Sequence, residues 1–175
     1  MSRNLTSTEL KRLHRTERRA TQRRMALLTD GVSNPYNLGS ILRTAAAFNC
    51  DHLWLVGAPS PNDAKVNKTA LGSQKFLTWT HCDSTAEAFS LASAAGYSLV
   101  GVELTETAVP LSTIEWADDC CLVLGHEDRG LSSEALQSLT TIGYIPQLGK
   151  IGSLNVAMAA GMAMYEFRRH TNVTD

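Results

Sequence analysis

The sequence predicts an α/β protein with a mainly parallel sheet flanked by helices. Short apolar runs alternate with segments of helical periodicity, and the links between them are short. Three of the links that follow apolar runs are rich in glycine and polar residues. With 175 residues and 43% hydrophobic content, the chain can bury one sizeable core. We therefore expect a basic helical extension over residues 1–24 and a single domain over residues 25–175.

The elements follow from these patterns in chain order. The first is a helix over Ser7–Arg24, and strands are then expected at Met25–Thr29, His52–Val56, Phe76–Thr80, Tyr97–Glu103, Cys120–Leu124 and Gly143–Ile145. Helices are expected between and after them at Asn37–Phe48, Thr85–Ala95, Ser132–Leu139 and Ser153–Arg169. We expect Asn37 and Ser153 to cap the second and last helices, and Ser132 or Ser133 to cap the helix before the last strand.

Basic residues are concentrated at the start of the chain. The net charge is −1, yet residues 1–24 carry eight of the sixteen Lys and Arg residues and a net charge of +6. The remaining residues therefore carry −7. This asymmetry fits a polyanionic partner, since a basic segment binds a phosphate backbone through counterion release. A solvated basic arm explains the charge equally well.

Several classes of protein do not fit the sequence. The polar N-terminus carries no secretory signal pattern, and no apolar run is long enough to span a bilayer. The four cysteines lack CxxC spacing, so we expect reduced thiols and a cytoplasmic location. The five histidines lack metal-ligand spacing, and we expect no metal. Gly149-Lys150 follows Gly143 at the wrong spacing for a P-loop, and Ile151 replaces its Ser or Thr.

The three glycine-rich loops hold the candidate functional residues. In parallel sheets, ligands gather at the carboxyl ends of strands, where such loops meet helix N-termini. The loops contain Asn37-x-Gly39-x-x-x-Arg43, Gly125-x-Glu127-x-x-Gly130-Leu131, and Ile145-Pro146-x-x-Gly149 followed by Ser153-Leu154-Asn155-Val156. Each loop alone is consistent with a capped packing helix or a surface turn, but their order and spacing together indicate one site.

In these three motifs the chain resembles the SpoU–TrmH branch of the SPOUT methyltransferases, over about residues 25–170. The stretches Ala70–Leu77 and Tyr97–Glu103 are similar to those of tRNA guanosine-18 ribose methyltransferases. His126 and Gly152 depart from the pattern, since relatives often have Ser or Asn at the first position and Arg at the second. The resemblance implies a SPOUT-type fold with a C-terminal trefoil knot, a homodimer, and S-adenosyl-L-methionine (SAM) as cofactor.

The resemblance also implies roles for individual residues. The catalytic set is Arg43, Asn37, Glu127, Ser153 and Asn155. The cofactor site is expected at Glu103, Leu104, Leu124, Gly125, Gly130, Ile145, Gln147, Ser153 and Leu154. RNA is expected to contact Arg12, Arg15, Arg18, Arg19 and Arg43. A guanidinium is a poor base at neutral pH, so stabilising the developing alkoxide is an easier role for Arg43 than removing a proton.

The expected reaction is methylation of a ribose 2′-hydroxyl in RNA, with a guanosine in the D-loop of tRNA as the first choice. Two alternatives stay open. One is a ribosomal RNA ribose methyltransferase; many of those relatives carry an extra N-terminal substrate domain, which favours tRNA for this chain. The other is a non-catalytic RNA-binding dimer that has kept the fold.

Overall fold

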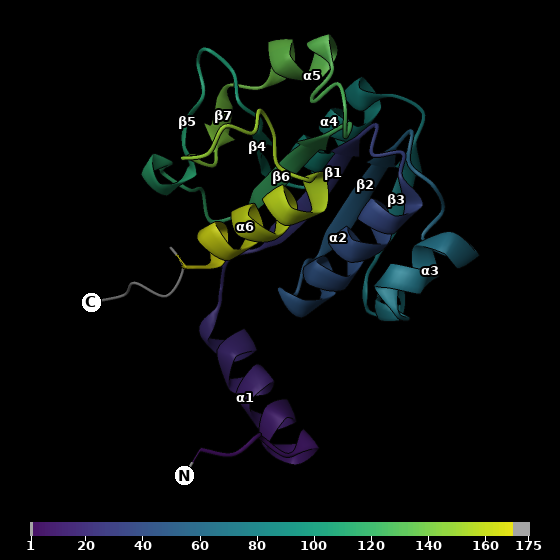
Figure 1. Cartoon of the computed structure of the whole chain (residues 1–175), viewed down its shortest axis with the longest axis vertical. Helices are drawn as coiled ribbons and strands as arrows, with labels where there is room; N and C mark the ends of the chain where they lie inside the picture. The colour runs from purple at the N-terminus through teal and green to yellow at the C-terminus, as the bar shows by residue number, and fades with distance from the viewer. Residues whose placement is uncertain (1, 170–175) are drawn as a thin grey trace.

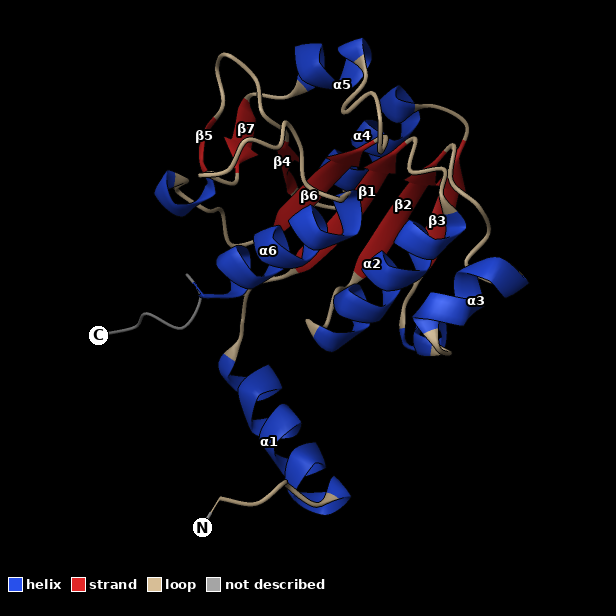
Figure 2. Cartoon of the chain, viewed as in Figure 1, coloured by secondary structure: helices blue, strands red, loops and turns tan. Residues whose placement is uncertain are grey.

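The computed structural model of the protein describes residues 2–169. A seven-stranded sheet in the order β3-β2-β1-β6-β4-β7-β5 forms the centre, and every neighbouring pair is parallel (Figure 2). The strands are β1 (Met25–Asp30), β2 (His52–Val56), β3 (Trp79–Cys82), β4 (Ser98–Val102), β5 (Val109–Pro110), β6 (Cys120–Gly125) and β7 (Thr141–Tyr144). The parallel α/β architecture predicted from the sequence is confirmed.

Helices cover both faces of this sheet, as Figure 1 shows. Helices α2 (Pro35–Ala47) and α6 (Val156–Arg169) cover one face, and α3 (Ala64–Ala70) packs against α2. On the other face lie α4 (Thr85–Ala94) and α5 (Ser133–Ser138). Helix α1 (Ser7–Ala20) stands away from the sheet and has no buried residue. No helix among residues 2–169 is long and apolar enough to cross a membrane.

The two central strands, β1 and β6, are buried on both faces. Successive side chains of a strand point to opposite faces, so Met25 and Leu27 enter the core under α2 and α6. Ala26 and Leu28 enter the core under α4 and α5. This alternation explains why β1 and β6 have continuous apolar runs.

The adjacent cysteines of β6 lie on opposite faces of the sheet for the same reason. Cys120 belongs to the core under α6, and Cys121 belongs to the core under α4. Both thiols are free and buried, and burial raises the pKa of Cys120 to about 12. A thiol with so high a pKa is unreactive at neutral pH, which fits a packing role.

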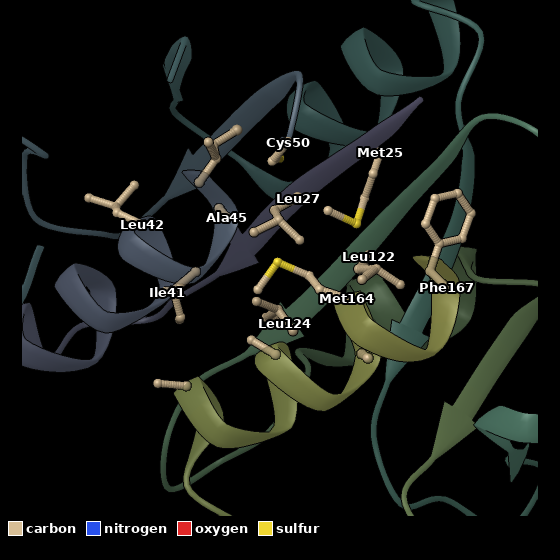
Figure 3. Close-up of a cluster of buried hydrophobic side chains, with 14 of the residues drawn as sticks. Met25, Leu27, Ile41, Leu42, Ala45, Cys50, Leu122, Leu124, Met164 and Phe167 are labelled. Carbon is tan, nitrogen blue, oxygen red and sulfur yellow. The ribbon is translucent and has the colours of Figure 1, made fainter. Parts of the chain in front are cut away.

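Figure 3 shows the larger core, where α2 and α6 pack side by side on β1 and β6. Ile41 and Leu42 of α2 and Met164 and Phe167 of α6 are fully buried there. Arg168, at the end of α6, donates to the backbone carbonyls of Arg23, Phe48 and Asn49 at 2.8–3.0 Å. These bonds tie the C-terminal end of α6 to the start of β1 and to the end of α2.

Some predicted boundaries were wrong. Helix α1 ends at Ala20 instead of Arg24, and β3 runs over Trp79–Cys82 instead of Phe76–Thr80 because a 3-10 turn, η1 (Ser73–Phe76), occupies its expected start. Strand β7 begins and ends earlier than predicted, at Thr141–Tyr144. Helix α3, strand β5 and the 3-10 turn η2 (Leu111–Thr113) were not predicted, because elements this short carry little periodicity.

Gly39 lies at a close contact between α2 and α3. A Cβ atom at this position would collide with Thr69 Oγ1 and the carbonyl oxygen of Val66. Gly161 of α6 is different, because a Cβ there would have only Thr44 Cγ2 nearby, at an ordinary 3.7 Å.

We predict that Gly39→Ala lowers the free energy of unfolding by about 1–3 kcal/mol, because overpacking outweighs the better helix propensity of alanine. Gly161→Ala is the matched control and should be neutral or stabilising by up to about 1 kcal/mol. Urea denaturation of both variants measures the difference. A Gly39→Ala variant as stable as Gly161→Ala would contradict the packing argument.

Candidate active site

The three motif loops meet at one edge of the sheet. They follow β1, β6 and β7, whose carboxyl ends all point to this edge because the sheet is parallel. The first two loops leave neighbouring strands, since Asp30 at the end of β1 pairs with Gly125 at the end of β6. The sheet thus brings together residues that lie far apart in the sequence.

The first loop is held by Asn34. Its side-chain oxygen accepts hydrogen bonds from the backbone amides of Tyr36 at 2.9 Å and Asn37 at 3.4 Å, and Pro35 follows at the first helical position. The predicted cap at Asn37 was therefore wrong by three residues. With Asn34 as the cap, the Asn37 side chain is released from that role and turns to the other loops.

Glu127 of the second loop receives four hydrogen bonds from the first loop. Its Oε1 accepts from the backbone amide of Asn34 at 2.9 Å and from Asn37 Nδ2 at 3.1 Å. Its Oε2 accepts from the backbone amide and the hydroxyl of Ser33 at 3.2 and 3.4 Å. Burial raises the pKa of Glu127, but hydrogen bonds from its own amide, Asn37, Asn34 and Ser33 bring it below the ordinary value of 4.5. The carboxylate therefore stays ionised at neutral pH.

Asn155 connects the third loop to the other two. Its Nδ2 donates to Asn37 Oδ1 at 3.0 Å, and its Oδ1 accepts from the backbone amides of Ala157 and Met158 at the start of α6. Asn155 is thus the helix cap, and the prediction that Ser153 caps this helix was wrong. A continuous donor chain runs from Asn155 through Asn37 to Glu127, and we call it the Asn155–Asn37–Glu127 relay.

The second loop turns back on itself within a few residues. His126 and Gly130 exchange two backbone hydrogen bonds of 2.9 Å, and a Cβ on Gly125 would collide with the backbone of Gly130. The carboxylate of Glu103 accepts from the amides of Leu104 and Leu131 at 3.0 and 3.1 Å. It fills the space where a side chain on Gly130 would lie. Gly125 is therefore required by close backbone packing, and Gly130 is favoured by its left-handed φ of 68°.

His126 lies beside this turn. Its Nδ1 accepts from the backbone amide of Asp128 at 3.0 Å, which leaves the proton of the neutral ring on Nε2, 3.4 Å from the hydroxyl of Ser33. The departure from the family pattern at this position thus adds a contact between the first two loops.

A cavity of about 440 Å³ opens between the ends of β4, β6 and β7 and the second and third loops. Its size is within the range of small-molecule sites. Eight of the nine residues predicted for the cofactor line it, namely Glu103, Leu104, Gly125, Gly130, Ile145, Gln147, Ser153 and Leu154. The ninth, Leu124, is 1% exposed and lies in the core under α6.

The structure brings together four of the five predicted catalytic residues. Asn37, Glu127 and Asn155 form the relay, and Ser153 lines the cavity with Glu127. Arg43 does not line this cavity. It is exposed on α2, in a hollow bordered by α1, η1 and the end of α6, and no hydrogen bond found within residues 2–169 involves its guanidinium.

Asp30 is a residue of this edge that the sequence reasoning missed. It is 6% exposed, and its carboxylate accepts from the hydroxyl of Thr85 at 2.6 Å and from the backbone amide of Ser132 at 2.7 Å. Ser132, one of the two residues predicted as the cap, in turn caps α5. An acidic residue directly after an apolar strand, at the loop edge of a parallel sheet, was the signal that could have identified it.

A protein-family match covers the three loops that form the site. The model of the SpoU rRNA Methylase family matches residues 24–165, and the chain belongs to this family. Two curated relatives are named for different RNA substrates. The chain is 30% identical to the tRNA (guanosine(18)-2′-O)-methyltransferase of Thermus thermophilus, over 86% of this chain and 77% of the relative. It is 32% identical to the 23S rRNA (guanosine-2′-O-)-methyltransferase of Acinetobacter baylyi, over 81% of this chain and 58% of the relative.

A solved structure shares the fold. The AdoMet-bound rRNA methyltransferase from Sinorhizobium meliloti matches with a TM-score of 0.79 and 30% identity, over 89% of this chain and 59% of that protein. The chain thus spans less than two thirds of the length of several of the proteins it matches.

We predict that Glu127→Gln lowers the free energy of unfolding at neutral pH by about 1–3 kcal/mol, because the amide cannot accept all four hydrogen bonds. The folded-state pKa of Glu127 is depressed, so its stabilisation is present above the unfolded pKa and is lost as the pH falls through the folded value. The difference in free energy of unfolding between wild type and variant should therefore become smaller below about pH 4.5. Chemical denaturation at pH 7 and pH 3 measures this difference. An equal difference at both pH values would contradict the conclusion that the ionised carboxylate of Glu127 stabilises the fold.

Proposed function

We propose that the protein transfers a methyl group from SAM to a ribose 2′-hydroxyl in RNA. The observation that carries this proposal is the Asn155–Asn37–Glu127 relay, which joins the three motif loops beside a cavity of suitable size. A relay of this kind fixes the loops relative to one another without a metal. Family membership supports the reaction class.

The residues of the cavity fit SAM. Gly125 and Gly130 line the cavity without a side chain, and Leu104, Ile145 and Leu154 supply apolar contact. An adenosine group matches such a lining, since backbone amides and carbonyls can bond its base while aliphatic side chains cover its faces. When bound, SAM supplies the activated methyl group. The AdoMet-bound relative from S. meliloti supports this choice of cofactor.

Arg43 is the proposed stabiliser of the ribose oxygen as it gains negative charge. Since Arg43 does not line the cavity of its own chain, a homodimer gives it a way to reach a cofactor site. Helix α6 offers a surface for such a dimer, because Met158, Met162 and Tyr165 are each 47–60% exposed on it. The C-terminal trefoil knot implied by the family resemblance is part of this proposal.

For the substrate we propose tRNA, with a guanosine of the D-loop as the target. The T. thermophilus guanosine-18 enzyme among the relatives supports this choice. The 23S rRNA enzyme of A. baylyi, at similar identity, supports ribosomal RNA as the second candidate. The exposed arginines of α1 favour a large folded RNA of either kind. Arg12, Arg15, Arg18 and Arg19 are all exposed, and the ion pairs found within residues 2–169 include none of them.

We predict that Arg43→Ala lowers methyl transfer by about 10²-fold or more while SAM binding is unchanged, because only the developing charge on the ribose loses its partner. Transfer of labelled methyl from SAM to unmodified tRNA and rRNA transcripts, with the product nucleotide mapped, measures it. Labelling of rRNA alone would replace the tRNA assignment by the second candidate. SAM binding with neither RNA labelled would reject both, and no SAM binding would favour a non-catalytic RNA-binding dimer.

We predict that replacing the four arginines of α1 with Gln weakens RNA binding and flattens its salt dependence, because each lost phosphate contact removes about 0.7–0.9 from the slope of log K against log salt. Binding titrations between 50 and 200 mM salt, which is roughly the range where this effect is large, measure it. The control for charge alone compares Lys65→Gln with Lys68→Gln on α3 against the charge-matched pair Arg12→Gln with Arg15→Gln on α1. Equal slopes for these two double variants would contradict a specific role for α1.

A further inference from the structure

Phe76 is the most exposed of the aromatic residues, with 73% of its surface open to solvent. It ends the 3-10 turn η1 and borders the same hollow as Arg43. An exposed phenylalanine leaves in water an apolar surface that burial would remove, so the position of Phe76 is unfavourable for folding alone.

The fold holds Phe76 outward. Leu71 and Gly72 take left-handed conformations, with φ of 51° and 79°, which end α3 and start η1. The amide of Gly72 donates to Asn67 Oδ1 at 2.9 Å, and the hydroxyl of Ser73 donates to the carbonyl of Ala70 at 2.6 Å. The next residue, Leu77, is 7% exposed in the core. Because Leu77 is anchored inward, Phe76 cannot turn into the core without unwinding η1.

The surroundings of Phe76 are cationic. The hollow it shares with Arg43 is also bordered by Arg18. Lys75 Nζ lies 5.0 Å from the centre of the Phe76 ring. An exposed ring beside several cations matches one kind of ligand well, namely a single-stranded nucleic acid, whose bases stack on aromatic side chains while its phosphates pair with Lys and Arg.

We propose that Phe76 is a stacking platform for an unpaired base of the RNA, next to the nucleotide whose ribose meets Arg43. This inference rests on the proposed function and extends it by defining which form of RNA the enzyme takes. A base inside a duplex is already stacked on its neighbours, so it cannot use this ring. The enzyme should therefore favour a target in a loop over the same nucleotide in a helix.

The test compares Phe76→Leu with Phe76→Trp. Leucine keeps the apolar volume but removes the ring, whereas tryptophan keeps a stacking surface. The control is Leu71→Ala, which removes an exposed side chain of the same region that does not border the hollow. Binding is measured with a single-stranded RNA oligomer, the same oligomer in a duplex, and an unmodified tRNA transcript, alongside methyl transfer and molecular mass.

We expect Phe76→Leu to weaken binding of the single-stranded oligomer by roughly 5- to 100-fold and of the duplex by less than about twofold, with Phe76→Trp and Leu71→Ala close to wild type. The KM for tRNA should rise with kcat nearly unchanged. Equal loss on duplex and single strand, or an unchanged single-strand affinity, would overturn the proposal. If Phe76→Leu loses a dimer that the wild type forms, the ring packs against a second copy of the chain and the proposal is overturned. If the wild-type protein binds the single-stranded oligomer but transfers no methyl group, the proposed function fails while the stacking role of Phe76 stands.

Discussion

The carboxylate of Glu127 is the point on which the candidate site depends. It receives four hydrogen bonds from the loop after β1, and through Asn37 it is linked to Asn155 at the start of α6. A partly buried carboxylate, with 14% of its side chain exposed, would be unfavourable without these donors, so they favour the arrangement of the loops that satisfies it. The site is thus fixed by the need to solvate one charge with protein groups.

The parallel sheet makes this arrangement possible. Strands β1 and β6 pair along their full length, so the loops that follow them start side by side. The glycines of the second loop then allow its backbone to fold tightly, and Glu103 fills the space that remains. Asn37, Glu127, Asn155 and the two glycines each solve a local problem of packing or hydrogen bonding, whereas Arg43 is exposed and does not.

Much of this could be predicted from the sequence. The central strands and the long helices have strong periodicity, and three ordered motifs located the loops. The caps were harder to predict, because Asn34 and Asn37 are equally good cap residues. Pro35, directly after Asn34, was the local signal for the first of them, while the partner that engages Asn37, Glu127, lies 90 residues away. Asp30 was missed for a similar reason, since its partners Thr85 and Ser132 come from distant segments. Arg43 was found by resemblance, while its distance from the cavity is visible only in three dimensions.

The three side-chain hydrogen bonds of Asn155, one donated and two accepted, limit which residue types fit at that position. Asp, Ser and Thr all cap helices well, and each could replace the bonds to Ala157 and Met158. A carboxylate has no proton to give to Asn37, and a hydroxyl is shorter than an amide. Glutamine has the right group on a longer stem that does not suit a cap. Position 155 therefore needs a side chain that accepts from the helix amides and also donates to Asn37, at the length of an asparagine. Substitutions that would keep the helix capped would still lose the bond that joins the third loop to the first.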